Sequence, residues 1–243
     1  MEKKSLYIIT GTSKGLGKAL LNVLLDTPHT SIIGISRTQM ESHANYTHHS
    51  IDLADTAALI QELDTVFPKG DYRKVVLINN AGWIGEIAHN GRLAPESLQA
   101  IYQINVTAPA ILMNAFMQRY DGLEGDKLVV NISSGAAAKV IDGWSGYCAS
   151  KAALNQMTQV AQHESDIADR GFRLYALSPG IIDTSMQEDI RSSSEENFSN
   201  LSRFRGFKEK NELSAPNEIA EKVLYLIEHH RDFREVLQDV RNF

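Results

Sequence analysis

Short apolar runs alternate with longer helical patterns along most of this chain, and no other feature limits its possible folds as strongly. The runs are rich in residues that favour β-strands. They lie at 6–10, 31–36, 47–51, 74–79, 127–133, 173–178 and 235–240. Apolar residues at helical spacing fill 14–26, 55–66, 95–120, 146–170 and 216–230. Because strands that alternate with helices form parallel sheets covered on both faces, the sequence predicts an α/β, doubly wound fold with seven parallel strands.

The length and composition indicate one domain that spans residues 1–243. The chain is 43% hydrophobic, which is enough for a sizeable core, and it contains no internal repeat or low-complexity linker. Residues 184–215 stand apart because they are polar and serine-rich with scattered apolar residues. Two interpretations stay open for this segment, a substrate lid and a solvated loop.

Charge and cysteine content exclude several classes of protein. The net charge is -6 and no run of lysine or arginine is present, so neither nucleic acid nor an anionic membrane is an expected partner. The apolar run near the N-terminus is only about five residues long, too short for a signal peptide or a membrane span. The single cysteine, Cys148, cannot form an internal disulfide, and no Cys/His set has zinc-ligand spacing. We therefore expect a cytoplasmic protein that holds no metal and acts on a small molecule.

A glycine-rich stretch, TGTSKGLGKAL, joins the first predicted strand to the first predicted helix. Gly11, Gly15 and Gly17 allow a tight turn and a close approach of backbone N–H groups to a pyrophosphate at the helix N-terminus. A glycine-rich turn without a ligand is the alternative. The position between strand and helix favours a dinucleotide site in a Rossmann fold.

The end of the second predicted strand bears on which dinucleotide is bound. An acidic residue there would accept hydrogen bonds from an unphosphorylated ribose, but this chain has Ser36 and Arg37. Lys14 adds a second cation beside the glycine loop. The two cations together favour NADPH/NADP+ over NADH/NAD+, because they can hold a 2′-phosphate; solvated surface charge is the alternative.

Tyr147 and Lys151 lie four residues apart in the predicted helix 146–170, so their side chains share one face. A tyrosine needs its pKa lowered by up to about 3 units, or about 4 kcal/mol, to exchange protons readily at neutral pH. A nearby ammonium stabilises the phenolate. The spacing therefore predicts that Lys151 lowers the pKa of Tyr147, although an ordinary tyrosine and a solvated lysine would fit the same spacing.

Several motifs together resemble the short-chain dehydrogenase/reductase superfamily over nearly the whole chain. They occur in the family's order as Thr10-Gly-Thr-Ser-Lys-Gly-Leu-Gly17, Asp52-Leu53, Asn79-Asn-Ala-Gly82, Asn105, Asn131-Ile-Ser-Ser134, Tyr147-x-x-x-Lys151 and Pro179-Gly180. The resemblance implies a single-domain Rossmann fold and reduction of a carbonyl by hydride transfer.

The resemblance also implies roles for individual residues. The catalytic group would be Ser134, Tyr147, Lys151 and Asn105, where the family's spacing selects Ser134 over its neighbour Ser133. The cofactor would contact Gly11, Ser13, Lys14, Gly15, Leu16, Gly17, Arg37, Asp52, Leu53, Asn79, Ala81, Gly82, Tyr147, Lys151, Pro179, Gly180, Ile182 and Thr184. Asn105 would hold a distortion in its helix and a water that links Lys151 to solvent.

The expected substrate is neutral and aromatic. Trp83, Ile84, Trp144, Met186 and the stretch 136–140 should border the cleft, and no arginine or lysine stands at an obvious substrate-facing motif position. Together with Ser134 and Tyr147, we expect Trp144 and Met186 to contact substrate, although either tryptophan could be core packing instead.

Within the superfamily, the segments around Tyr147 and Pro179 are similar to the sepiapterin-reductase branch, above all to its bacterial members that reduce benzil to (S)-benzoin. Its last residues, EVLQDVRNF, differ from the extended C-terminal tail with which animal sepiapterin reductases anchor a pterin, so we do not expect sepiapterin to be the natural substrate. An aromatic 1,2-diketone is therefore the favoured substrate. Sepiapterin reduction, oxidation of an alcohol and a non-catalytic sensor of NADP(H) stay open as alternatives.

The resemblance further implies a homodimer, with a tetramer possible. Small residues along the helix after the catalytic pair, Ala152, Ala153 and Ala161, together with the helix that carries Asn105, could pack against a second copy of the chain.

Overall fold

The computed structural model describes residues 3–41 and 43–243 of the protein. In this part of the chain, seven strands form one sheet in the order β3-β2-β1-β4-β5-β6-β7, and every neighbouring pair is parallel. The strands are β1 (Ser5–Thr10), β2 (Thr30–Ser36), β3 (Tyr46–Ser50), β4 (Lys74–Asn79), β5 (Asp126–Ile132), β6 (Phe172–Ser178) and β7 (Leu237–Asp239). This confirms the predicted single-domain, doubly wound fold with seven parallel strands.

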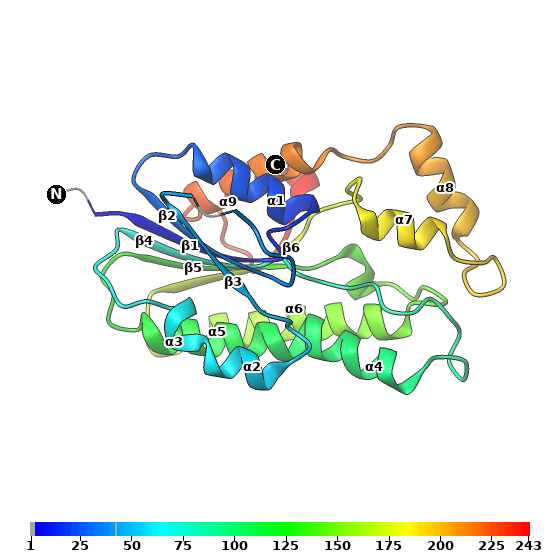
Figure 1. Ribbon diagram of the computed structural model, residues 1–243, viewed down its shortest axis with the longest axis horizontal. Coiled ribbons are helices and arrows are strands. Elements are labelled where there is room, and N and C mark those ends of the chain that lie inside the picture. Colours follow the sequence, from blue (N-terminus) through cyan, green and yellow to red (C-terminus); the bar gives the residue numbers. More distant parts are fainter. Residues whose placement is uncertain (1–2, 42) are drawn as a thin grey trace.

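Helices cover both faces of the sheet (Figure 1). On one face lie α1 (Gly15–Leu25) and α9 (Pro216–Glu228). On the other lie α2 (Thr56–Gln61), α3 (Leu63–Val66), α4 (Pro95–Tyr102), α5 (Ala108–Arg119) and α6 (Ser145–Ile167). Two further helices, α7 (Ser185–Arg191) and α8 (Leu201–Glu209), extend beyond the carboxyl ends of the strands. No described helix is long and apolar enough to cross a membrane.

The central strands are apolar throughout because each strand faces two cores. In β4, Val76 and Ile78 pack in the core formed with α1 and α9, whereas Val75 and Leu77 pack in the core formed with α5 and α6. All four side chains are fully buried. Continuous apolar runs are therefore what a parallel sheet between two helical layers requires.

Two predicted helices are interrupted. The pattern over 95–120 predicts one helix, but α4 and α5 are separated by a π-helical turn, Gln103–Thr107, which contains Asn105. The pattern over 55–66 divides into α2 and α3 at Glu62. In both cases the apolar spacing continues across the break, so periodicity alone does not reveal it.

The 184–215 segment contains α7 and α8 and is not a solvated loop. Ile190, Phe198 and Leu201 are almost completely buried and form an apolar cluster with Trp144 and Tyr147. The scattered apolar residues of this segment therefore pack against the rest of the domain.

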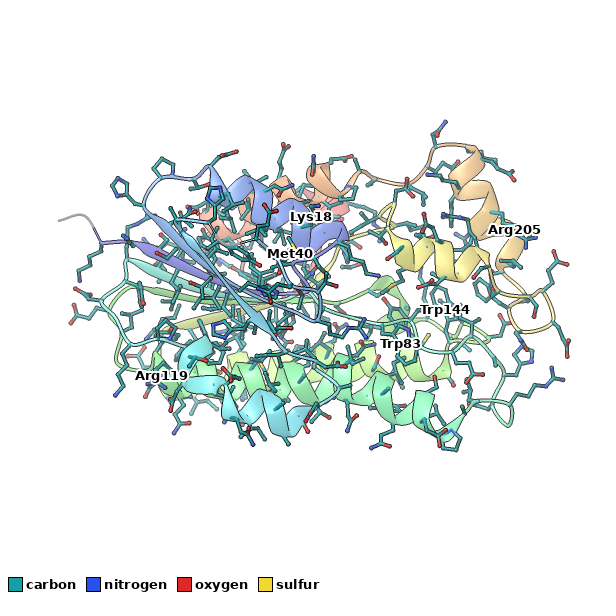
Figure 2. All side chains as sticks on the ribbon, viewed as in Figure 1. Lys18, Met40, Trp83, Arg119, Trp144 and Arg205 are labelled. Atoms are coloured by element: carbon teal, nitrogen blue, oxygen red, sulfur yellow. The ribbon has the colours of Figure 1, made fainter. Side chains whose placement is uncertain are left out.

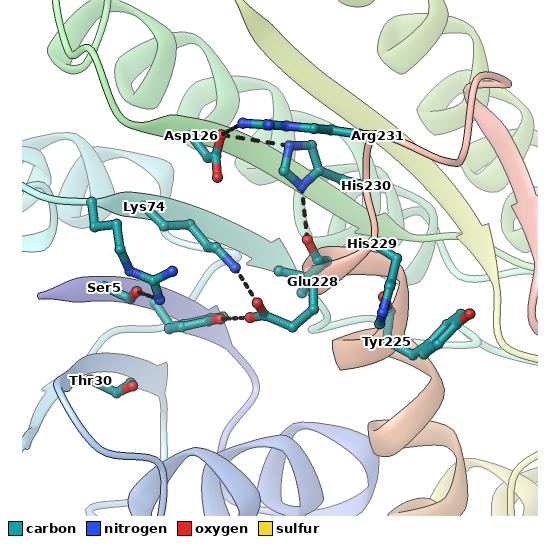
Figure 3. A network of polar contacts seen from close by, with 12 residues as sticks. Ser5, Thr30, Lys74, Asp126, Tyr225, Glu228, His229, His230 and Arg231 are labelled. Carbon is teal, nitrogen blue, oxygen red and sulfur yellow. Dashed lines mark hydrogen bonds and ion pairs between the residues drawn. The ribbon is translucent and has the colours of Figure 1, made fainter.

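Charged groups form a network at the end of the sheet where the strands begin (Figure 3). The Lys74 side chain at the start of β4 is only 2% exposed, and its ammonium lies 2.7 Å from the carboxylate of Glu228 in α9. The Tyr7 hydroxyl donates a hydrogen bond of 3.1 Å to the same carboxylate. Burial of Lys74 is tolerated because its charge is paired.

The order of the strands determines where a ligand can bind. From β1 the chain builds outward to β2 and β3 on one side, and to β4, β5, β6 and β7 on the other. The loops that follow β1 and β4 therefore diverge at the carboxyl edge of the sheet, which leaves a crevice between them.

Candidate active site

A cavity of about 1100 Å³ lies at the carboxyl edge of the sheet. This volume exceeds the range of about 300–1,000 Å³ that is typical of sites for drug-sized ligands. The lining runs from the β1–α1 loop, past the ends of β4, β5 and β6, to α7 and α8. The cavity is thus large enough for a dinucleotide and a second small molecule.

The β1–α1 loop forms a close-fitting cradle. Gly11 and Gly15 have φ of +76° and +57°, a region that favours glycine. Gly17 has no room for a side chain, because a Cβ there would lie 2.1 Å from the Gly11 carbonyl oxygen. Gly17, a predicted cofactor contact, is therefore buried beneath the loop and does not line the cavity. Gly11, Ser13, Lys14, Gly15 and Leu16 do line it.

Two side chains that the sequence interpretation did not single out hold this loop in place. The Thr10 hydroxyl accepts hydrogen bonds from the backbone N–H groups of Asn80 and Ala81, both at 2.9 Å. The Asn80 amide donates to the Thr10 carbonyl oxygen at 2.8 Å. Thr10 and Asn80 both belong to motifs found in the sequence, and their place in those motifs was the signal that could have identified them.

At one end of the cavity, two cations and one carboxylate surround the exit from β2 and β3. Lys14 and Arg37 are exposed on the lining, and neither pairs with a carboxylate of the described residues. Asp52 and Leu53 line the same end. The Asp52 carboxylate caps its own turn by accepting the backbone N–H of Ala54 at 3.0 Å.

Tyr147 and Ser134 meet in the middle of the cavity. Tyr147 is 7% exposed, and burial raises the pKa of its phenol, while a hydrogen bond with the Ser134 side chain opposes the increase. Ser134 lies just after β5 and caps the following turn by accepting the N–H of Ala136 at 3.1 Å. The neighbouring Ser133 side chain is instead bonded to Asn155.

Lys151 lies one helical turn after Tyr147, with its ammonium 5.8 Å from the centre of the phenol ring. It donates a hydrogen bond of 2.8 Å to the Ile132 carbonyl oxygen. Burial lowers the pKa of Lys151 to about 8, so it is mostly charged at neutral pH. The predicted acidification of Tyr147 by Lys151 is not found in the protein alone, because the cost of burying a phenolate outweighs the other effects.

Asn105 does not line the cavity but supports its wall. Its side-chain oxygen accepts the Trp83 N–H at 2.9 Å, and its amide donates to the Trp83 carbonyl at 2.8 Å and to the Ser150 hydroxyl at 3.1 Å. The Ser150 hydroxyl in turn donates to the Tyr147 carbonyl at 2.9 Å. Asn105 thus joins the π-helical turn, the segment after β4 and the helix of Tyr147.

The remaining predicted cofactor residues divide into two groups. Those on the cavity lining are Ala81, Gly82, Pro179, Gly180, Ile182 and Thr184. Asn79 lies outside the lining, because it is the last residue of β4 and its amide donates to Asn131 at 2.8 Å within the sheet. Its neighbour Asn80, which the prediction omitted, lines the cavity instead.

The far end of the cavity is aromatic. Trp144 is 6% exposed and stacks on Phe198 with ring centres 5.2 Å apart. It therefore combines the two roles that the sequence left as alternatives, since it is packed in a cluster and also lines the cavity. Trp83 and Trp144 lie at the same end of the molecule as α7 (Figure 2). Met186 lines this end as well.

This end is less neutral than predicted. Lys139 and Arg203 both line the cavity, and the Arg203 guanidinium lies 5.4 Å from the centre of the Phe207 ring. Arg203 comes from α8, which only the tertiary structure brings to the cavity.

Among the described residues, no group of three or more His, Cys, Asp or Glu side chains could hold a metal ion.

These residues fit a nicotinamide dinucleotide. The crowded Gly17 position holds the loop backbone against the N-terminus of α1, where N–H groups and the helix dipole favour a pyrophosphate. The Lys14, Arg37 and Asp52 end suits an adenosine, and the Ser134, Tyr147 and Lys151 group lies further along the same cavity.

Comparisons with known proteins agree with this geometry. The family model of short chain dehydrogenases matches residues 5–195. A benzil reductase of Bacillus subtilis that forms (S)-benzoin is 40% identical over 227 residues, or 92% of this chain and 93% of that protein. The sepiapterin reductase of Bos taurus is 30% identical over 249 residues, or 94% of this chain and 91% of that protein.

Solved structures share the fold. A short chain dehydrogenase/reductase from Saccharomyces cerevisiae has a TM-score of 0.83 at 24% identity and covers 97% of this chain and 96% of its own. A 4-hydroxyisoleucine dehydrogenase complexed with NADH has a TM-score of 0.79 at 23% identity, with 97% and 96% covered. A Burkholderia cenocepacia enzyme in complex with NADP has a TM-score of 0.75 at 21% identity, with 98% and 88% covered. The cavity, the motifs and a family model that matches most of the chain all agree. This chain therefore belongs to the short-chain dehydrogenases, oxidoreductases that use nicotinamide cofactors.

Proposed function

We propose that this oxidoreductase is an NADPH-dependent carbonyl reductase whose substrate is an aromatic 1,2-diketone such as benzil, with (S)-benzoin as the product. The observation that carries the proposal is that Ser134, Tyr147 and Lys151 line one long cavity, with the Lys151 ammonium 5.8 Å from the centre of the Tyr147 ring. The aromatic end of that cavity and the 40% identity to a benzil reductase support the substrate class.

The side chains around the reacting carbonyl have distinct tasks. The hydride would come from a dinucleotide held against the glycine loop. Ser134 donates a hydrogen bond to the substrate oxygen, where negative charge develops, and Tyr147 delivers the proton. Burial keeps the Tyr147 phenol neutral, which suits a proton donor in the reductive direction. Lys151 holds the cofactor's ribose and its charge faces the phenol.

Lys14 and Arg37 support the choice of NADPH. They are the cations at the adenosine end of the cavity, and Ser36 ends β2 where an enzyme that prefers NADH would place a carboxylate. We expect the Arg37→Ala variant to lose roughly tenfold or more in NADPH affinity while NADH affinity changes little, because one charge-assisted contact to phosphate is removed. Titration of each nucleotide against both proteins measures this, and equal losses for the two nucleotides would contradict the assignment.

The substrate proposal is tested by following NADPH oxidation with benzil, sepiapterin, simple aldehydes and keto acids, with NADH as the control cofactor. We expect turnover of benzil, and chiral chromatography should identify (S)-benzoin. Preference for sepiapterin would support the alternative that the 30% identity to the bovine enzyme suggests. Failure to reduce any dicarbonyl would exclude the proposed substrate class.

The catalytic proposal is tested with Tyr147→Phe. This variant should lose turnover by several orders of magnitude because the proton donor is gone, yet bind NADPH nearly as tightly as the unaltered enzyme. We therefore expect assays to show no turnover, while titration with NADPH gives the same affinity as for the unaltered enzyme. Retention of substantial activity would show that another group supplies the proton.

We also propose a homodimer formed through α4 and α6. Tyr102 of α4 and Val160 and Ile167 of α6 are exposed apolar residues that a second copy could cover, whereas Ala161 is already buried in the domain's own core. Sedimentation analysis distinguishes a dimer from a monomer or tetramer, and Val160→Lys should shift the equilibrium toward the monomer.

A further inference from the structure

The Asp142 carboxylate joins two separate parts of the cavity wall. It belongs to the loop that precedes Tyr147, and it accepts three hydrogen bonds from the segment that leads into α8. Its two oxygens accept the Ser199 N–H at 2.7 Å, the Ser199 hydroxyl at 2.8 Å and the Asn200 amide at 3.5 Å. The same carboxylate lies 3.4 Å from His89 Nε2.

The backbones of these two segments are also in direct contact. Gly143 has a φ of +74°, and a Cβ at this position would lie 2.3 Å from the Asn197 carbonyl oxygen. No other residue type fits here without moving one segment away from the other. The contact therefore extends from Asp142 along the chain.

Aromatic packing continues the same contact into the cavity. Trp144 stacks on Phe198 at 5.2 Å and meets Phe204 of α8 edge to face at 5.3 Å. It also meets the ring of Tyr147 edge to face at 5.6 Å. Trp144 and Phe204 line the cavity, whereas Asp142 does not.

The two hydrogen bonds from Ser199 to Asp142 are short and charge-assisted. The backbone N–H of Ser199 lowers the pKa of this carboxyl, with further hydrogen bonds from the Ser199 and His89 side chains, so the group is ionised at neutral pH. Three consecutive residues, Asp142, Gly143 and Trp144, thus hold one segment by charge, close backbone contact and ring stacking.

We propose that Asp142 is a positioning residue that holds α8 over the substrate end of the cavity and thereby sets the preference for large aromatic substrates. It acts through Ser199, Trp144 and Phe204 rather than by touching substrate. The substrate preference rests on the proposed carbonyl reduction, whereas the position of α8 can be tested without any turnover.

Tryptophan fluorescence tests the position of α8 directly. The chain has two tryptophans, so Trp83→Phe leaves Trp144 as the sole reporter. In this background, Asp142→Ala should shift the Trp144 emission to longer wavelength and increase its quenching by acrylamide, because the ring loses its cover. Asp142→Asn, which keeps one acceptor oxygen, should give a smaller change in the same direction. An unchanged spectrum in both variants would overturn the proposal.

Kinetics then separate positioning from general damage. We expect Asp142→Ala to raise KM for benzil roughly tenfold with kcat changed less than about twofold, and to leave KM for the small diketone 2,3-butanedione and the affinity for NADPH unchanged. Equal losses for both diketones, or weakened NADPH binding, would show a merely structural role and overturn the proposal. Should Asp142→Ala fail to fold, Ser199→Ala removes one of the same bonds and should change KM in the same direction.

Arg92→Ala is the matched control. Arg92 lies in the segment between β4 and α4 and pairs with Glu196, three residues before Ser199, and both side chains are solvent-exposed. Exposed pairs contribute little, so this variant should leave both the fluorescence and the KM for benzil unchanged. An effect as large as that of Asp142→Ala would overturn the special role of Asp142. If the unaltered enzyme reduces no dicarbonyl, the proposed function fails and the fluorescence result still decides whether Asp142 holds α8.

Discussion

The proposed catalytic pair, Tyr147 and Lys151, shows how burial changes the properties expected of two side chains. The spacing of Tyr147 and Lys151 predicts an acidic phenol, yet burial raises the pKa of Tyr147 and lowers that of Lys151 to about 8. Both shifts arise because burial disfavours the charged form of each side chain. A neutral phenol next to a charged amine is suited to donate a proton, whereas the reverse reaction requires further positive charge at the site.

The buried charge of Lys151 should therefore lower the free energy of unfolding of the protein. Its pKa in the folded protein, about 8, is below the usual 10.5, so the buried ammonium costs up to about 3 kcal/mol at neutral pH. The cost is complete below pH 8 and disappears as the pH rises past 10.5. We expect Lys151→Met to raise the free energy of unfolding at pH 7 while turnover is lost.

Urea denaturation without dinucleotide, at pH 7 and at pH 10, measures this difference. The advantage of the Lys151→Met variant should shrink at the higher pH, where the unaltered protein no longer carries the buried charge. A variant that is less stable at pH 7, or an advantage that does not depend on pH, would contradict the argument.

At the scale of single elements, the helices α1 and α8 each contain a glycine, and the space available for a side chain differs between the two positions. Gly17 in α1 has no space for a Cβ, whereas a Cβ on Gly206 in α8 would meet nothing within 4 Å. The first glycine is required by packing against the loop backbone. The second has no packing reason, and in a helix it is less favourable than alanine.

These two positions form a matched pair of variants. Gly17→Ala should weaken NADPH binding by more than tenfold and lower the melting temperature, because the loop must move away from α1. Gly206→Ala should stabilise the protein by about 0.5–1 kcal/mol without changing nucleotide affinity. Calorimetric titration and thermal unfolding measure both effects. Normal nucleotide binding by Gly17→Ala would show that the cradle is not required.

At the scale of the whole molecule, the parallel sheet separates function from stability. The loops that follow the strands form the cavity, while the amino ends of the strands carry the Lys74, Glu228 and Tyr7 network (Figure 3). Burial alone would raise the pKa of Glu228, but hydrogen bonds from Lys74 and Tyr7 and the charges of Lys74 and Arg73 together lower it.

We expect Glu228→Gln to reduce the free energy of unfolding by about 1–2 kcal/mol at pH 7, because the buried Lys74 ammonium loses its partner. Since the folded pKa of Glu228 lies below its usual value of 4.5, the pair stabilises fully above pH 4.5 and less as the pH falls further. The difference between the two proteins should therefore shrink in acid, while NADPH affinity stays the same. A loss of stability that is constant down to low pH would contradict the ion-pair explanation.

The alternation of strands and helices, the position of the glycine loop and the shared face of Tyr147 and Lys151 could all be predicted from the chain, because each depends on residues close in sequence. The exclusion of Asn79 from the cavity and the approach of α8 to Trp144 could not, and the distortion at Asn105 was implied by the family resemblance but not by the periodicity of the chain. Each of these depends on contacts between residues far apart in the sequence, such as Asn105 with Trp83 and Asp142 with Ser199. Local patterns encode which elements form and which way their side chains face, whereas the folded chain sets which distant groups meet and how strongly burial shifts their charges.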